Sequence, residues 1–147
     1  MVIVIREINE SDLRNGFLEA LDNLVSPNLT EERALRILKK IKLNELHKIF
    51  VAINTSNNQV IGCITLLIEF KFINQGMKVG YIEDVAVRRG YERKGIGRKL
   101  VNHVTNFATS RAKCKKIILY CSKNNIPFYN KLGFKLEGAV VMIFEST

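Results

Sequence analysis

Two adjacent acidic residues, Glu83 and Asp84, stand in the middle of a largely apolar run from Val79 to Val87. Such a run predicts a buried β-strand, in which neighbouring side chains point to opposite faces of the sheet. Burying a carboxylate is costly unless it is paired or takes part in binding or chemistry. The pattern therefore favours a functional pair, while a solvated strand edge or a structural salt bridge with a lysine stays open for one of the two.

A glycine turn follows this strand, in the segment Glu92-Arg93-Lys94-Gly95-Ile96-Gly97 just before a predicted helix over 96–110. The first N–H groups of a helix have no partner within it, and its dipole is positive at that end, so the position attracts anions. Glycine lets an anion come close to the backbone, and basic side chains surround the turn: Arg93, Lys94, Arg98 and Lys99. The turn suits a pyrophosphate, although a G-x-G string by itself is more often an ordinary turn.

Neither common nucleotide-binding motif fits this turn. The string is not G-x-x-x-x-G-K-[ST], and a dinucleotide-binding fold would place G-x-G-x-x-G after the first strand of a parallel sheet. Here the glycines follow the fourth predicted strand.

The segments around these residues predict a mixed α/β (α+β) domain. The predicted elements are a strand over 2–8, a helix after Ser11, a helix capped by Asn28 or Thr30, strands over 49–53, 60–70 and 79–87, a helix over 96–110, a strand over 116–121, a short helix over 126–132, and a hairpin over 134–136 and 139–144. With 147 residues, 47% of them hydrophobic, the chain is sized for one domain over 1–147.

The charge of the chain favours an anionic partner. The 23 basic and 14 acidic residues give a formal net charge of +9, and the basic residues are spread along the chain. The partner could be a small molecule with phosphates, an acidic membrane surface or a nucleic acid. No basic-aromatic interleaving or nucleic-acid motif is present, and we expect neither a nucleic-acid nor a membrane partner.

The three cysteines, Cys63, Cys114 and Cys121, have neither C-x-x-C spacing nor nearby histidine pairs, so they predict no disulfide framework and no zinc site.

The apolar start of the chain is cut short by Arg6 and Glu7, too soon for a signal sequence or a membrane span. We expect a cytoplasmic protein. His47 and His103 are interpreted as surface or packing residues.

The glycine turn and the segment from Asn124 to Phe134 together resemble the GCN5-related N-acetyltransferase (GNAT) superfamily. The turn is similar to its pyrophosphate motif R/Q-x-x-G-x-G/A, and Asn124-Asn125-Ile126-Pro127-Phe128-Tyr129-Asn130-Lys131-Leu132-Gly133-Phe134 is similar to N-x-x-x-F-Y-x-x-x-G-F. The resemblance implies a mostly antiparallel central sheet of about six to seven strands flanked by about four helices. Glu92 departs from the first motif position, which leaves backbone amides, Arg93 and Lys94 to hold phosphate.

The resemblance implies acetyl-CoA as a co-substrate and requires no metal. The residues that it implies for binding acetyl-CoA are Val85, Ala86, Val87, Arg93, Lys94, Gly95, Ile96, Gly97, Arg98 and Asn125. Amide formation needs a neutral amine, a polarised thioester carbonyl and a stabilised thiolate. We expect Glu83 or Asp84 to orient and deprotonate the amine, and Tyr129 to act as general acid toward the departing sulfur.

The strand Gly80-Tyr81-Ile82-Glu83-Asp84-Val85-Ala86-Val87 resembles the G-H-I-E-D-[VI]-x-V strand of the glucosamine 6-phosphate N-acetyltransferases. That resemblance implies acetylation of glucosamine 6-phosphate for UDP-N-acetylglucosamine synthesis, by direct attack in a ternary complex. It implies a substrate-binding role for Glu83 and Asp84 and for the loop Lys71, Phe72, Ile73 and Asn74, with Lys71 on the phosphate.

Two departures bear on the acceptor. Tyr120 stands where this family has an acidic residue, and no basic residue near Phe144 matches its C-terminal one. A GNAT enzyme for another amine (a protein N-terminus, a lysine or a polyamine) and a non-catalytic acyl-CoA-binding module remain as alternatives. The resemblance also implies a homodimer with the C-terminal strand region at the interface, which the apolar run Ala139 to Phe144 allows.

Overall fold

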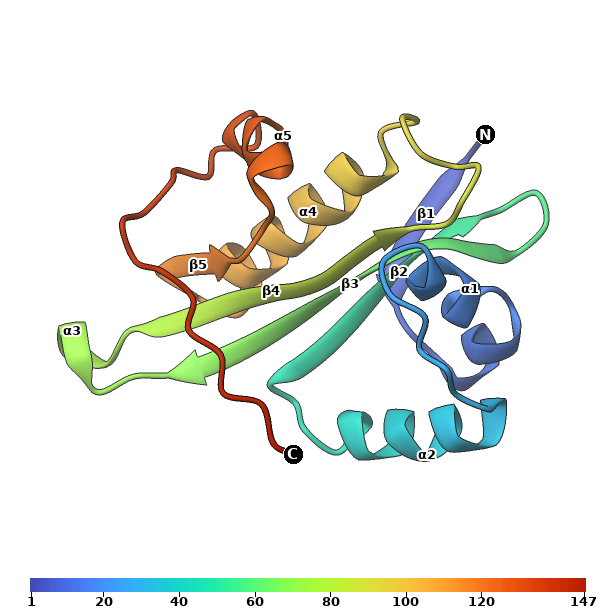
Figure 1. The fold of residues 1–147 in the computed structure, drawn as a ribbon, viewed down its shortest axis with the longest axis horizontal. Coiled ribbons are helices and arrows are strands. Elements are labelled where there is room, and N and C mark those ends of the chain that lie inside the picture. Colours follow the sequence, from blue (N-terminus) through green and yellow to red (C-terminus); the bar gives the residue numbers. More distant parts are fainter.

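A computed structural model describes all 147 residues (Figure 1). Its strands are β1 (Ile3–Glu7), β2 (His47–Asn54), β3 (Gln59–Phe70), β4 (Lys78–Val87) and β5 (Lys116–Leu119). Its α-helices are α1 (Phe17–Asp22), α2 (Glu31–Lys42), α3 (Ile73–Gly76), α4 (Ile96–Asn106) and α5 (Ile126–Asn130). Shorter helical turns are η1 (Glu10–Arg14), η2 (Phe107–Arg111) and η3 (Lys123–Asn125).

The five strands form one sheet in the order β1-β2-β3-β4-β5. The first four pair antiparallel, and β5 joins β4 in parallel after the crossover through α4. A parallel neighbour requires such a crossover, whereas the polar segment from Thr55 to Asn58 closes the β2–β3 hairpin. The mixed, mostly antiparallel sheet that the sequence predicts is confirmed.

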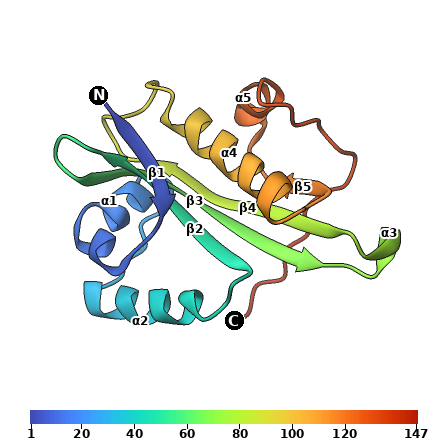
Figure 2. The same cartoon turned by 180° about the vertical axis from the view of Figure 1, so that it is seen from behind.

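The sheet separates two apolar cores. Side chains of η1, α1 and α2, such as Leu13, Phe17 and Leu38, pack with one set of strand residues. The α4 residues Leu100 and Val104 pack with a second set. Figures 1 and 2 show these helices from the two sides of the molecule, with α1 and α2 away from α4 and α5. None of the helices combines the length and the apolar character needed to cross a bilayer.

The first predicted helix is divided at Gly16. Its φ of +108° belongs to a region that side chains with a Cβ disfavour, and an added Cβ would lie 2.7 Å from the carbonyl oxygen of Val60. The chain therefore changes direction between η1 and α1. The second helix begins as predicted, because the Thr30 hydroxyl accepts a hydrogen bond from the Arg33 N–H at 3.2 Å.

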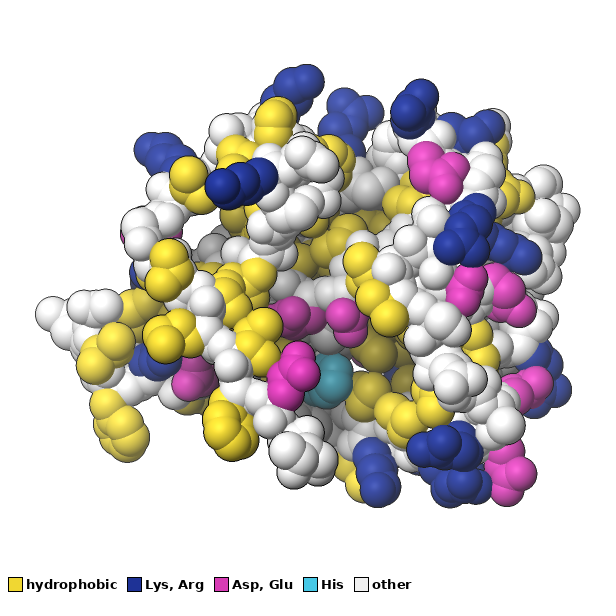
Figure 3. Space-filling model, viewed as in Figure 1, with side chains coloured by type: hydrophobic (Ala, Val, Ile, Leu, Met, Phe, Trp, Pro, Cys, Tyr) yellow, Lys and Arg dark blue, Asp and Glu magenta, His cyan; other side chains and the backbone are white.

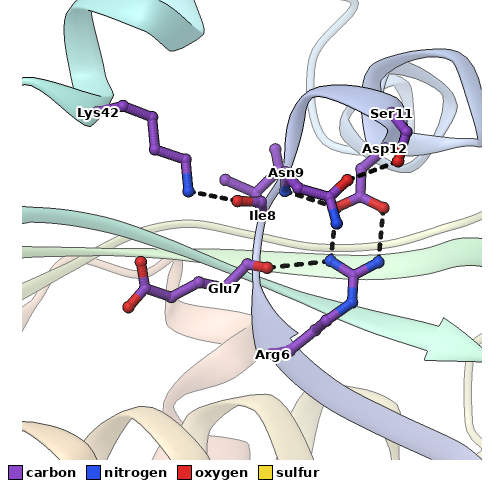
Figure 4. Close-up of polar contacts among 7 residues, drawn as sticks. All are labelled: Arg6, Glu7, Ile8, Asn9, Ser11, Asp12 and Lys42. Atoms are coloured by element: carbon purple, nitrogen blue, oxygen red, sulfur yellow. Dashed lines mark hydrogen bonds and ion pairs between the residues drawn. The ribbon is translucent and has the colours of Figure 1, made fainter.

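A partly buried ion pair ties β1 to η1 (Figure 4). The Arg6 guanidinium donates to both carboxylate oxygens of Asp12, at 2.7 and 2.9 Å, and the Asn9 N–H donates to the same carboxylate at 2.8 Å. Asp12 is 2% exposed. Lys42 of α2 donates to the carbonyl of Ile8, which follows β1. These contacts hold β1, η1 and α2 together.

The predicted C-terminal hairpin over 134–136 and 139–144 is wrong. Residues 131–147 contain no strand, so the sheet has five strands and not six to seven. The apolar side chains of this segment stay exposed, including Val140 at 82% and Phe144 at 96%. A strand needs a neighbour for its backbone hydrogen bonds, and this segment has none within one copy of the chain.

Candidate active site

The acidic residues of β4 lie at a β-bulge. Glu83 is the register partner of Thr65 and Ala86 that of Cys63, so Asp84 and Val85 stand opposite the single residue Ile64. Asp84 takes a left-handed φ of +50°, which aspartate tolerates better than most residues. The extra residue of a bulge leaves backbone groups outside the strand ladder.

The bulge changes where the two carboxylates point. Regular alternation would send Glu83 and Asp84 to opposite faces of the sheet. In the structure both line one cavity of about 350 Å³ between the sheet and helices α1 and α2. His47 from β2 lines it as well. Figure 3 shows acidic side chains and a histidine around a hollow at the centre of the face turned to the viewer.

The environment of Glu83 favours proton uptake. Its side chain is half-buried, and this burial raises the pKa of the carboxyl above its ordinary value, with a further increase from the neighbouring Asp84 charge. A carboxylate with a raised pKa is a stronger base than an exposed one. The arrangement can attract a cationic amine and accept its proton.

The edge of β4 toward β5 is open beside this acidic pair. The two strands are paired only from Val79 to Ile82, opposite Lys116 to Leu119. Beyond Ile82, β4 continues to Val87 without a partner on that edge. The predicted residues Val85, Ala86 and Val87 all lie on this free part of β4, where an extended ligand could hydrogen-bond to the backbone.

The glycine turn opens α4 as predicted. Gly95 caps the helix with a φ of +79°, and the helix starts at Ile96, which is buried. Arg93, Lys94 and Arg98 are exposed around this end. Since the first N–H groups of α4 have no partner in the helix, they and the basic side chains form a site suited to phosphate.

Gly97, in the first turn of α4, lies beside Phe128 of α5. A Cβ at this position would lie 3.4 Å from the Phe128 ring, at van der Waals contact. The start of α4 therefore lies close to α5. The two predicted motifs meet here although they are about thirty positions apart in the chain.

Glu92 has a structural partner in Asn23, directly after α1. Its carboxylate accepts hydrogen bonds from the Gly90 N–H at 2.8 Å and from the Asn23 side chain at 3.0 Å. The same Asn23 amide donates to the carbonyl of Val87 at 2.7 Å. Hydrogen bonds from its own backbone N–H and from that of Gly90 lower the pKa of Glu92, with a smaller contribution from Asn23. The Asn23 bonds fasten the loop between β4 and α4 to the end of α1. Glu92, which departs from the family motif, thus helps to hold the loop between β4 and α4 in position.

Tyr129 lies on α5, half-buried between the rings of Phe128 and Phe134, whose centroids are 4.9 and 5.8 Å away. It packs against the same core as Val85 and Val87 of the open β4 edge. Burial raises the pKa of its hydroxyl, with a smaller contribution from Cys121, so the group keeps its proton at neutral pH. Asn125 ends the turn η3 directly before this helix.

The loop from Lys71 to Asn74 lies apart from the acidic pair. It forms the tip of the β3–β4 hairpin around α3, away from α1 and α2 (Figure 1). Phe70 pairs with Lys78 and Thr65 with Glu83, a separation of roughly 17 Å along the strand. The Lys71 ammonium forms an ion pair with Glu69 at 3.0 Å. One copy of the chain does not bring Lys71 to the carboxylates.

Two contributions to the site were not predicted from the sequence. His47 lines the cavity beside the acids, although its lysine-rich surroundings in sequence indicate a surface residue. Asn23 has no motif at all and is recognisable only from its contacts. His103, by contrast, packs edge-on against Phe50 at 5.0 Å, and burial lowers its pKa, as expected of a packing residue. No group of three or more potential metal-ligating side chains is present.

The profile of the Acetyltransferase (GNAT) family matches residues 11–134. The chain belongs to this family. It is 32% identical over 146 residues to glucosamine 6-phosphate N-acetyltransferase 1 of Dictyostelium discoideum, covering 99% of this chain and 92% of the relative. It is 34% identical to the glucosamine 6-phosphate N-acetyltransferase of Arabidopsis thaliana, covering 88% of this chain and 87% of the relative.

The fold is that of a GNAT acetyltransferase. The crystal structure of glucosamine-6-phosphate N-acetyltransferase from Arabidopsis thaliana superposes with a TM-score of 0.91 at 30% identity, covering 99% of this chain and 100% of that one. The family resemblance and the fold predicted from the sequence are confirmed. GNAT acetyltransferases take the acetyl group from acetyl-CoA.

Proposed function

We propose that this GNAT enzyme transfers the acetyl group of acetyl-CoA to the amine of glucosamine 6-phosphate. The product, N-acetylglucosamine 6-phosphate, would serve UDP-N-acetylglucosamine synthesis. The observation that carries the proposal is the bulge in β4, which turns Glu83 and Asp84 toward one cavity beside the open strand edge. The names of the Dictyostelium and Arabidopsis relatives support this acceptor.

In the proposed reaction, Glu83 accepts a proton from the sugar ammonium, and its raised pKa suits this role. Asp84 holds the ammonium in place through its charge. The backbone N–H of Val85 polarises the acetyl carbonyl as the amine attacks it, because the bulge leaves backbone groups there without strand partners. Tyr129 donates its proton to the departing sulfur, since its hydroxyl is still protonated at neutral pH.

The donor is proposed to bind along two elements. Val85, Ala86 and Val87 offer backbone hydrogen bonds to the extended part of acetyl-CoA at the open edge of β4. The start of α4 takes the pyrophosphate through the amides of Gly95, Ile96 and Gly97 and the charges of Arg93, Lys94 and Arg98. Asn125, at the start of α5, is the remaining residue proposed to contact acetyl-CoA.

We further propose that residues 1–147 form a single domain that acts as a homodimer in the cytoplasm. Its C-terminal segment exposes large apolar side chains, and β5 lies at an edge of the sheet. A second copy could cover both and bring its own Lys71–Asn74 loop toward the sugar phosphate, which Lys71 does not reach within one copy. The three cysteines are unpaired, as suits a reducing compartment.

Removal of residues 135–147 tests this dimer. We expect the full chain to have the mass of a dimer by light scattering, and the shortened chain to be a monomer with a much larger KM for glucosamine 6-phosphate. A shortened chain that stays dimeric, or a monomer with unchanged KM, would contradict the proposed dimer.

The acceptor is tested by coenzyme A release over a panel of amines, each at saturating acetyl-CoA. We expect glucosamine 6-phosphate to give a higher kcat/KM than glucosamine, a lysine peptide or spermidine. A higher kcat/KM for one of the other amines would show that this amine, and not the sugar phosphate, is the acceptor. Tight binding of acetyl-CoA without turnover of any amine would instead indicate a non-catalytic binding module.

A further inference from the structure

The positive charge of the chain is concentrated in one segment. Residues 93–136 hold 11 of the 23 lysines and arginines and none of the 14 acidic residues. The other residues hold 12 basic and 14 acidic side chains, so their formal charge is −2. The segment comprises α4, η2, β5, η3 and α5, which lie away from α1 and α2 (Figures 1 and 2). The net charge of +9 therefore comes from this side of the molecule alone.

The basic side chains of this segment are not neutralised within the protein. All 11 are exposed, and none takes part in the six ion pairs of the structure, which join residues between Arg6 and Arg89. These cations are thus available to a partner with many negative charges. A nucleic acid gains free energy from such cations, because neutralised phosphates release the counterions condensed on them.

Eight of the cations near α4 form two groups, one at each end of the helix. The group at its start consists of Arg93, Lys94, Arg98 and Lys99. The group beyond its end, around η2 and the beginning of β5, consists of Arg111, Lys113, Lys115 and Lys116. With a rise of about 1.5 Å per residue over α4 and η2, the two groups lie roughly 20 Å apart. A pyrophosphate at the start of α4 leaves the second group free.

The surface between the two groups is polar and uncharged. The exposed side chains of α4 and η2 between them are Asn102, Asn106, Thr109 and Ser110. Amides and hydroxyls of this kind hydrogen-bond to phosphate oxygens. No large hydrophobic side chain is exposed between residues 93 and 119. Insertion into lipid and stacking on unpaired bases use apolar or aromatic side chains, whereas a duplex backbone is bound by cations and hydrogen-bond donors.

We propose that this basic side of the protein binds the phosphate backbone of double-stranded nucleic acid, without reading its sequence. The two groups of cations contact phosphates at the two ends of α4, and the amides and hydroxyls between them contact the same backbone. No such partner was expected from the sequence, because the basic residues are spread along the chain, but the fold brings them to one side. This binding needs no acetyl transfer and goes beyond it.

Lys113 offers a variant that removes charge and relieves the backbone. Its φ of +62° lies in the left-handed region, which glycine adopts more readily than lysine. Lys113→Gly combined with Lys115→Gln therefore removes two cations of the second group and should keep the thermal unfolding temperature. The matched control is Lys39→Gln combined with Lys40→Gln, which removes two exposed lysines from α2 and leaves the same net charge.

The test is fluorescence anisotropy of a labelled DNA duplex of about 20 base pairs, titrated with the full chain. If six phosphates are neutralised, we expect the affinity to fall about 10³-fold between 50 and 200 mM salt. At 50 mM salt, the Lys113–Lys115 variant should bind at least ~10-fold more weakly than the wild type, and the α2 control within about threefold of it. No binding at 50 mM salt, or an equal loss for the two double variants, would overturn the inference.

Two further measurements identify the partner and the surface. Vesicles of phosphatidylserine and phosphatidylcholine should not displace the duplex, and a protein that prefers them would bind a membrane instead, which would overturn the inference. Saturating coenzyme A should weaken duplex binding, because both use the start of α4, and an unchanged affinity would overturn the proposed surface. Acetyl transfer by the same preparation shows whether the protein is active, so a failure to bind the duplex leaves the proposed function standing.

Discussion

Replacing Tyr129 by phenylalanine removes one hydroxyl and leaves the ring. The ring packs against Phe128 and Phe134, so we expect the variant to keep its fold and its thermal unfolding temperature. General acid catalysis contributes about 100-fold or more, and water can replace part of it at a half-open site, so we expect kcat to fall ~10–100-fold. This corresponds to about 1.4–2.7 kcal/mol of lost transition-state stabilisation.

The assay follows coenzyme A release with a thiol-reactive dye at saturating concentrations of both substrates. Because the pKa of Tyr129 is raised, the wild-type enzyme should keep its proton donor up to strongly alkaline pH, and a decline there should disappear in the variant. Tyr91→Phe, which also removes a hydroxyl from a half-buried ring, serves as control. Unchanged kcat for Tyr129→Phe, or an equal decrease for Tyr91→Phe, would refute the assignment of the general acid.

Three further predictions follow from the contacts of the site. Asn23→Ala removes the bonds to Glu92 and to the loop before α4, so initial-rate kinetics should show a several-fold higher KM for acetyl-CoA with little change in kcat. Asp84→Asn removes a charge that raises the pKa of Glu83; the acidic limb of its kcat/KM profile should therefore move to lower pH, but only in part, because burial is the larger cause. Asp12→Ala leaves a half-buried guanidinium without its partner, and urea denaturation should show a free energy of unfolding lower by ~2–4 kcal/mol, whereas an unchanged value would contradict the importance of this ion pair.

The parts of the site that local rules govern were predictable. The turn at Gly95 and the helix at Ile96 follow from glycine chemistry and helical periodicity, which act over a few residues. The short helix that carries Tyr129 was predicted as well, with Pro127 near its start. The sequence also predicted every strand from β1 to β5, since each is an apolar run bounded by polar residues.

The parts that depend on distant partners were not predictable. The bulge at Asp84 is visible only once β3 and β4 are paired, because it is a mismatch between two strands and not a pattern within one. Alternation alone would have separated Glu83 from Asp84. The apolar run Ala139 to Phe144 has the composition of a strand, yet it forms none, since a strand also requires a neighbour that one copy does not provide. The role of Asn23 depends on contacts with residues more than sixty positions away.

The central claim is that the acidic pair at the bulge serves an amino-sugar acceptor beside a coenzyme A site. The most direct measurement is the identity of the product formed from acetyl-CoA and glucosamine 6-phosphate, by mass spectrometry, with the wild type and with the double variant Glu83→Gln, Asp84→Asn. We predict N-acetylglucosamine 6-phosphate from the wild type, and at least ~100-fold slower formation by the double variant although it still binds acetyl-CoA. No acetylated sugar from the wild type, or equal rates for both proteins, would contradict the account.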